Sequence, residues 1–207
     1  MEYHPHGDLN KHLTRRLPED ETRIIAGQLL EGLNFMHRNS FAHRDLKPHN
    51  IMVVTPGPDW LVQISDFGIS RRFEGDGTVT LKQGTMGFIA PELLGLSPPG
   101  SSPYVSDIFS LGAVLFFTLT NSIFAKDVHR LRDFANGNFT AVEPETKLLR
   151  GLGLSTLCCR FVCGLLAPAP EDRISSQEAL KHSWIGQLGV VDDTREYLPY
   201  RPPVREA

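Results

Sequence analysis

The sequence predicts a mainly α-helical fold that carries one short β-hairpin. Two observations support the helices: apolar residues recur at the spacing of one helix face within residues 18–39, and residues 104–119 are apolar on nearly every face. A third supports the hairpin, because two β-branched runs flank a segment rich in proline and glycine. With 207 residues, 41% of them hydrophobic, the chain can bury a core as one domain or one large lobe.

The first predicted helix covers residues 18–39, "PEDETRIIAGQLLEGLNFMHRN". Its first turn is acidic, which suits the positive end of a helix dipole. Ile25, Leu29, Leu33 and Met36 form one apolar stripe. This segment is therefore predicted to be a strongly amphipathic helix.

The predicted hairpin pairs "NIMVV" at residues 50–54 with "LVQIS" at residues 61–65. The intervening "TPGPDW" contains two prolines and a glycine and is typical of a turn. A long irregular stretch from Gly68 to Gly87 follows.

Further helices are predicted downstream, at residues 104–119, 154–166 and 175–185. Ser175 or Ser176 is expected to cap the last of these, with Glu178 near capping-box spacing. The middle one carries all three cysteines, Cys158, Cys159 and Cys163, which we interpret as reduced packing residues rather than a disulfide framework or a metal site. Residues 186–207 are polar and contain several prolines, so a loosely packed tail is expected.

Charge and hydropathy limit the partners that the sequence favours. The net charge of −3 and the pI near 6.2 give no reason to expect a nucleic acid or an anionic membrane surface as a partner. The longest apolar run, Ile108 to Thr120, is shorter than the roughly twenty residues that a bilayer requires. Because the first residues also lack the pattern of a secretory signal, we expect a cytoplasmic or nuclear protein.

Two polar motifs lie at the two ends of the predicted hairpin. "AHRDLKPHN" occupies residues 42–50, and "SDFG" occupies residues 65–68. Hairpin geometry should bring Asp66 close to Asp45, Lys47 and Asn50. Hard oxygen ligands beside a lysine suit magnesium and a polyphosphate.

These motifs resemble those of eukaryotic protein kinases. "HRDLKPHN", "DFG" and "GTMGFIAPE" are similar to the catalytic loop, the metal loop and the substrate-binding segment of that family, in the same order. "SDIFSLG" and Arg173 in "PEDRIS" extend the resemblance, which covers residues 1–185. It implies a kinase-like C-terminal (lower) lobe in which the hairpin carries the catalytic and metal loops.

The resemblance implies a role for each polar residue of the site. Asp45 corresponds to the catalytic aspartate that orients the substrate hydroxyl, and Lys47 to the lysine that steadies the transferred phosphoryl group. Asn50 and Asp66 correspond to the magnesium ligands. The implied cofactors are ATP and Mg²⁺. Lys47 together with Thr85 resembles the serine/threonine class, so the implied partner is a protein with a serine or threonine acceptor.

The start of the chain resembles the hinge of the nucleotide pocket. Met1 matches the gatekeeper position, and Glu2 to His4 would offer backbone groups to adenine. Asp8 is placed for the ribose, and Met52 is expected to line the adenine surface.

Other residues resemble regulatory or scaffolding positions. Arg44 and Arg71 resemble a basic pocket for a phosphorylated Thr78 or Thr80, although the two arginines could instead only solvate the loop. Thr85 resembles the residue that hydrogen-bonds toward the catalytic loop.

Four further matches imply structural roles. His43 and Phe67 resemble packed residues that stack the two loops on the core. Asp107 resembles the buried carboxylate that holds the catalytic-loop backbone, and Glu92 with Arg173 resembles a buried ion pair.

A glycine-rich phosphate loop, a strand lysine and its partner glutamate, which complete a kinase domain, have no match in these residues. Residues 1–185 are therefore expected to be a partial kinase domain that starts at the hinge, followed by the tail at 186–207. Three hypotheses remain: a fragment of an active kinase, a catalytically impaired binding module, and a lobe completed by another chain. Activity of the chain alone is expected to be poor, with an exposed upper face open to a partner.

Overall fold

Helices dominate the structure, a computed structural model that describes residues 5–66, 71–72, 86–99 and 102–186. The helices are α1 (Glu19–Arg38), α2 (Val105–Thr120), α3 (Val128–Ala135), α4 (Glu143–Gly151), α5 (Thr156–Leu165), α6 (Ser176–Leu180) and α7 (Ser183–Gly186). The strands are β1 (Phe41–Ala42), β2 (Ile51–Thr55), β3 (Leu61–Ile64) and β4 (Arg71–Arg72). The predicted mainly α-helical fold with a short hairpin is confirmed.

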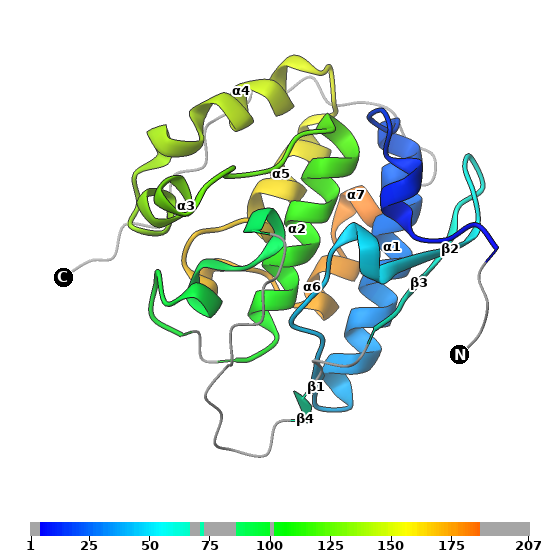
Figure 1. Cartoon of the computed structure of the whole chain (residues 1–207), viewed down its shortest axis with the longest axis horizontal. Coiled ribbons are helices and arrows are strands. Elements are labelled where there is room, and N and C mark those ends of the chain that lie inside the picture. Colours follow the sequence, from blue (N-terminus) through cyan, green and yellow to red (C-terminus); the bar gives the residue numbers. More distant parts are fainter. Residues whose placement is uncertain (1–4, 67–70, 73–85, 100–101, 187–207) are drawn as a thin grey trace.

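Helix α2 forms the centre of the molecule (Figure 1). Thirteen of its sixteen residues are buried, which explains why the sequence is apolar on nearly every face of this helix. Helices α1 and α5 pack against it on different sides. The buried set nevertheless includes Asp107 and Ser110, so the core carries polar groups that need partners inside it.

Helix α1 buries the predicted stripe, and its first turn ties three parts of the fold together. Ile25, Leu29, Leu33 and Met36 are all buried. Glu19 Oε1 accepts hydrogen bonds from Ser155 Oγ (2.6 Å) and Trp184 Nε1 (2.8 Å). The acidic start of α1 therefore holds the beginning of α5 and the final helix α7, besides complementing its own helix dipole.

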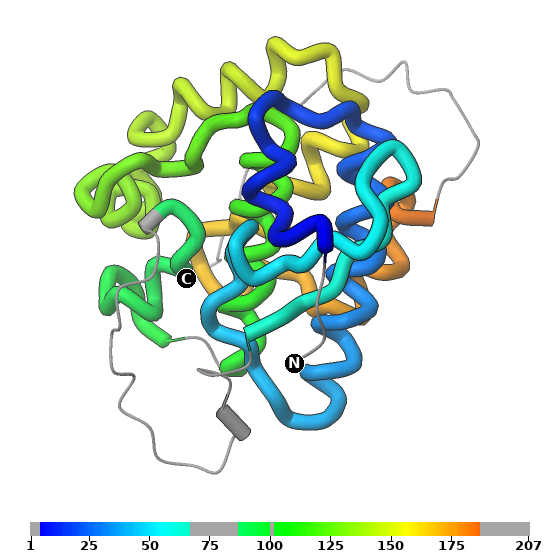
Figure 2. The backbone as a smooth tube through the Cα atoms, turned by 45° about the vertical axis from the view of Figure 1, so that its right-hand side comes forward, coloured from blue at the N-terminus to red at the C-terminus, as the bar shows by residue number. Residues whose placement is uncertain are grey.

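The hairpin lies against α1 and against the N-terminal segment (Figure 2). Strands β2 and β3 are antiparallel, with Ile51 opposite Ile64. Gln28 of α1 donates to Trp60 O and accepts from Val62 N, both at 2.7 Å. These side-chain hydrogen bonds attach the hairpin to α1. The loops at the two ends of the hairpin are therefore fixed relative to this helix.

Some elements differ from the sequence prediction. The single helix predicted at residues 175–185 is two short helices, α6 and α7. Ser175 caps α6 in a capping box with Glu178, whose pKa is lowered by the hydrogen bonds from Ser175. Helices α3 and α4 were not predicted, because each is short. A two-residue strand, β4, interrupts the stretch predicted to be irregular, and the predicted tail lies outside the described residues.

The cysteines are free thiols, as predicted. Cys158 and Cys159 are buried, and Cys163 is half-buried. Burial raises the pKa of the Cys159 thiol to about 11, so this group is neutral at physiological pH. Separately, no helix among the described residues is long and apolar enough to cross a membrane.

The contact between α2 and α5 depends on the absence of a side chain at Gly112. A Cβ atom there would lie 2.9 Å from both Leu165 Cβ and Leu166 Cγ. Gly112→Ala should therefore separate the helices and lower the free energy of unfolding by about 1–3 kcal/mol in urea titrations. Gly27→Ala on α1, where an added Cβ would meet nothing within 4 Å beyond the local helix backbone, should instead be neutral or stabilising by up to about 1 kcal/mol. Equal effects of the two substitutions would contradict this account of the helix contact.

Candidate active site

The loop that follows β1 is anchored from below by one buried carboxylate. Asp107, on α2, is fully buried, and its Oδ2 and Oδ1 atoms accept hydrogen bonds from His43 N (2.8 Å) and Arg44 N (2.7 Å). Two backbone donors thus fix the loop relative to the core helix. The predicted contact of Asp107 with the backbone of the loop that carries Asp45 is confirmed.

His37 adds a contact that the sequence analysis did not identify. Its Nε2 atom lies 2.9 Å from Asp107 Oδ2, and its Nδ1 atom lies 3.2 Å from Ser176 Oγ. Its ring stacks on Tyr104 with centroids 4.7 Å apart. His37 continues the apolar stripe four residues after Leu33, and this spacing could have indicated an inward-facing polar residue.

Two residues of the site adopt the left-handed backbone conformation, which glycine adopts most readily and which is unusual for an arginine. Arg44 has φ = 65° and Asp66 has φ = 60°. The left-handed region costs a non-glycine residue about 1–2 kcal/mol. Such strain persists only where surrounding contacts enforce it, and at Arg44 the bond to Asp107 is one such contact.

Three predicted residues meet on this loop. Asp45 Oδ2 accepts hydrogen bonds from Lys47 Nζ (2.7 Å) and Asn50 Nδ2 (2.9 Å). Asn50 Nδ2 also donates to the backbone O of Asp45 at 2.8 Å. The side chains of Lys47 and Asp45 are 18% and 13% exposed, so they are held in place but still reach the surface.

The hairpin brings the start of the second motif to the same place. Ser65 donates from its N and Oγ atoms to Asn50 O, at 2.8 and 3.1 Å. His43 Nε2 donates to Ser65 O (3.0 Å), while its Nδ1 accepts from Asp45 N (3.3 Å). Asp66 follows directly, so its backbone lies next to the Asn50 end of the loop. Phe67, the other residue predicted to stack here, lies outside the described residues.

The oxygen atoms of Asn50 and Asp66 are ligands of the type that a hard cation prefers. Both hydrogen bonds of the Asn50 amide use Nδ2, and its Oδ1 takes part in neither. Magnesium is typically held by one or two carboxylates together with water and phosphate oxygens. Asn50 and Asp66 fit that small set of oxygen ligands.

Asp8 and Met52, which the resemblance assigns to the nucleotide surface, are neighbours in the structure, and their roles there stay predictions. They form a β-bridge, and Val53 N donates to Gly7 O at 2.8 Å. Asp8 also caps the 3-10 helix Leu9–His12, since its carboxylate accepts from Lys11 N (3.3 Å). The predicted hinge residues Glu2 and His4 lie outside the described residues.

The arrangement of the loop residues agrees with the family to which the sequence is matched. A family model described as the protein kinase domain matches residues 1–185.

The chain belongs to the protein kinase family.

Individual relatives and structures support this membership. The chain is 35% identical over 192 residues to serine/threonine-protein kinase cds1 of Schizosaccharomyces pombe, covering 89% of this chain and 40% of the relative. It is 32% identical over 178 residues to serine/threonine-protein kinase 17A of Oryctolagus cuniculus, covering 84% and 43%. The structure of the Rad53 kinase domain and SCD2 with AMPPNP matches with a TM-score of 0.69 at 25% identity, covering 93% of this chain and 71% of that one. The chain thus spans less than half the length of these two curated relatives.

In this kinase-family chain, the predicted ion pair between Glu92 and Arg173 is confirmed and is buried. Arg173 Nη1 and Nη2 donate to the two carboxylate oxygens of Glu92 at 2.6 and 2.9 Å. The remaining donors bond to backbone oxygens of Ala167, Val105 and Pro168. All five N–H groups of the guanidinium are therefore satisfied, which allows the charge to be buried.

The predicted regulatory residues are only partly described. Strand β4 pairs with β1, with Arg71 opposite Ala42, so the backbone of Arg71 lies near the loop that contains Arg44. Thr78, Thr80 and Thr85 lie outside the described residues. Their roles, and the phosphate pocket formed by the two arginines, stay predictions.

Removing one charge of the buried pair should cost far more than removing an exposed one. Glu92→Gln leaves the guanidinium of Arg173 buried without its counter-charge and should lower the free energy of unfolding by about 3–5 kcal/mol. The control, Glu143→Gln, removes the exposed partner of Lys147 (2.7 Å) and should leave the urea midpoint nearly unchanged. Comparable losses for both variants would show that Arg173 does not depend on its carboxylate.

Proposed function

We propose that this chain carries the lower-lobe catalytic site of an ATP- and magnesium-dependent serine/threonine protein kinase. The observation that carries the proposal is the hydrogen-bonded cluster of Asp45, Lys47 and Asn50 on a loop anchored to a buried carboxylate. A purely structural loop has no need for a preorganised carboxylate and ammonium that both reach the surface, with a buried amide held against them. Phosphoryl transfer needs such groups, because positioning and electrostatic stabilisation supply most of its catalysis.

Asp45 would position the acceptor. Lys47 and Asn50 both bind its Oδ2 atom, and Oδ1 takes part in neither bond. In our proposal Oδ1 receives the substrate hydroxyl, which it orients toward the phosphoryl group and from which it takes the proton as the oxygen attacks.

Lys47 would hold the transferred group, and Asn50 and Asp66 would hold the metal. The ammonium of Lys47 lies beside Asp45, so a phosphoryl oxygen close to the acceptor could also lie within its reach. When bound, magnesium offsets the negative charge of the phosphates. Asn50 is oriented for this role by its two bonds to Asp45, and Asp66 is supplied by the loop after β3.

The acceptor and the remaining machinery are also part of the proposal. Lys47 two residues after Asp45, and relatives named serine/threonine-protein kinases, favour a serine or threonine hydroxyl on a protein. We propose that the glycine-rich loop and strand lysine come from residues other than these 207, and that the chain by itself transfers phosphate poorly. The face that includes Asp8 and Met52 would be covered by that upper lobe or by a partner.

The roles can be separated by substitution in the chain joined to an upper lobe that provides a glycine-rich loop and a strand lysine. Asp45→Asn should lower kcat by about 10²–10⁴-fold with little change in ATP affinity, because it contacts the acceptor. Asp66→Asn should remove magnesium-dependent ATP binding as well as transfer. The measurements are radiolabel transfer to a generic serine/threonine protein substrate and calorimetric titration with Mg-ATP.

Asp59→Asn, in the exposed hairpin turn, is the matched control and should behave like the unchanged chain. Loss of ATP affinity in Asp45→Asn would contradict the division of roles. Full transfer by Asp45→Asn would contradict the proposed function.

A further inference from the structure

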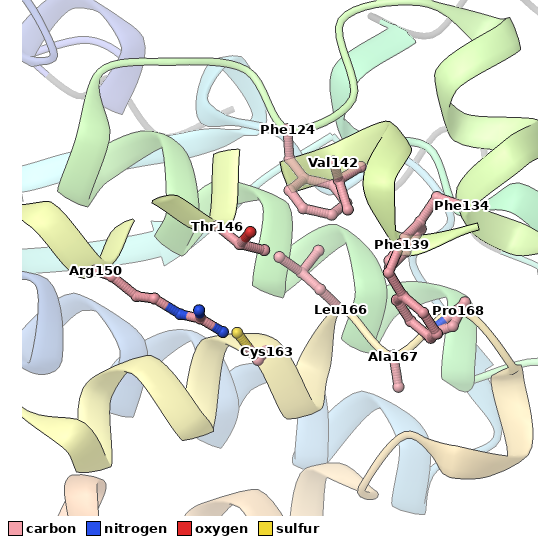
Figure 3. Close-up of a pocket in the computed structure, with 10 residues that line it drawn as sticks. All are labelled: Phe124, Phe134, Phe139, Val142, Thr146, Arg150, Cys163, Leu166, Ala167 and Pro168. Carbon is pink, nitrogen blue, oxygen red and sulfur yellow. The ribbon is translucent and has the colours of Figure 1, made fainter. Parts of the chain in front are cut away.

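A cavity that is separate from the candidate active site lies beside α2, where α3, α4 and α5 surround it. It has a volume of about 160 Å³ and is lined by residues from α3, the 3-10 helix Phe139–Val142, α4, α5 and the segments that flank them (Figure 3). None of its lining residues belongs to the loops that carry Asp45 or Asp66. Any ligand of this cavity would therefore bind away from the proposed phosphoryl-transfer site.

One side of the cavity is an aromatic wall. Phe124 and Phe134 are 4% and 5% exposed, and their rings meet edge to face with centroids 5.3 Å apart. Phe134 makes a similar contact with Phe139 at 6.0 Å. The two buried rings hold each other, so this part of the wall is preformed and presents the geometry that another aromatic ring prefers, and the exposed Phe139 extends it toward the surface.

The other side carries the polar groups. Thr146 and Arg150 come from successive turns of α4, and Cys163 comes from α5. Figure 3 shows the guanidinium end of Arg150 beside the Cys163 sulfur, across the cavity from Phe139. The lining is thus divided into an aromatic end and a cationic end.

Both acidic residues of α4 form ion pairs with basic residues that do not line the cavity. Glu145 binds Arg130 (2.6 Å), and Glu143 binds Lys147 (2.7 Å). Arg150 contributes a positive charge to the cavity edge, and its guanidinium has five donors, enough to bind a carboxylate in addition to other contacts. The guanidinium of Arg150 can therefore bind a ligand anion alongside the contacts that it already makes.

We propose that the cavity binds a small aromatic carboxylate, with its ring on the phenylalanine wall and its carboxylate on Arg150. The volume supports a single ring, because an engineered apolar cavity of about 150 Å³ binds benzene. A long acyl chain or a nucleotide is too large for the enclosed part. The arginine favours an acid over a neutral aromatic compound.

The test uses 3-phenylpropionate as the probe and the reactivity of Cys163 as the readout. Cys163 is half-buried and lines the cavity, whereas Cys158 and Cys159 are buried in the core. Saturating probe should slow iodoacetamide alkylation of Cys163 at least fivefold, as measured by peptide mass spectrometry. Neutral 3-phenylpropanamide should bind at least tenfold more weakly in the same assay, because it lacks the charge that Arg150 recognises.

Matched variants locate the site. Arg150→Met should weaken the acid at least tenfold and leave the amide unchanged. The control, Arg160→Met, removes an exposed arginine of α5 that does not line the cavity and should bind like the unchanged chain. Thr146→Phe, at a half-buried position on the wall, should fill the cavity and abolish protection of Cys163.

The proposal is overturned if the acid does not protect Cys163, or if Arg150→Met and Arg160→Met bind it equally. It is also overturned if acid and amide bind equally to the unchanged chain, a comparison that needs no variant to fold. None of these readouts depends on phosphoryl transfer.

Discussion

The carboxylate of Asp107 is the constraint on which the candidate active site depends. It is fully buried within the central helix and is bound by two backbone N–H groups and by His37. A buried charge without such partners would cost several kcal/mol, so the loop and the helix each require the other. The strained backbone of Arg44 and the arrangement of Asp45, Lys47 and Asn50 follow from where these two amides are held.

The same reasoning applies to another buried charge of the core, that of Arg173. Arg173 satisfies all five donors between Glu92 and three backbone oxygens, and its guanidinium lies 4.9 Å from the centre of the Phe109 ring. Asp107 is itself a residue of the first turn of α2, and Arg173 is bound to the same helix through the backbone oxygen of Val105. The central helix therefore contributes much of the apolar core and also fixes the positions of the polar segments that bind to it.

Much of this arrangement could be predicted from the sequence, because the informative patterns are local. The apolar stripe of α1, the hairpin and the polar motifs at its two ends need only short-range periodicity and turn chemistry. His37 was missed because its role depends on Ser176, which is 139 residues away. Helices α3 and α4 were missed because they are short and gain their stability from packing. The cavity could not be predicted because only the fold brings together its lining residues, which range from Phe124 to Pro168.

The central claim is that Asp107 holds the loop that carries Asp45 in place in the free chain, and amide hydrogen exchange tests it directly. In the unchanged chain without nucleotide, the amides of His43 and Arg44 should exchange as slowly as those in the middle of α2. In Asp107→Asn, one carboxylate oxygen becomes an N–H donor that faces a backbone donor, so at least one of the two amides should exchange about 100-fold faster or more, which corresponds to about 2.7 kcal/mol. Fast exchange of both amides in the unchanged chain, or unchanged protection in Asp107→Asn while α2 stays protected, would contradict the account.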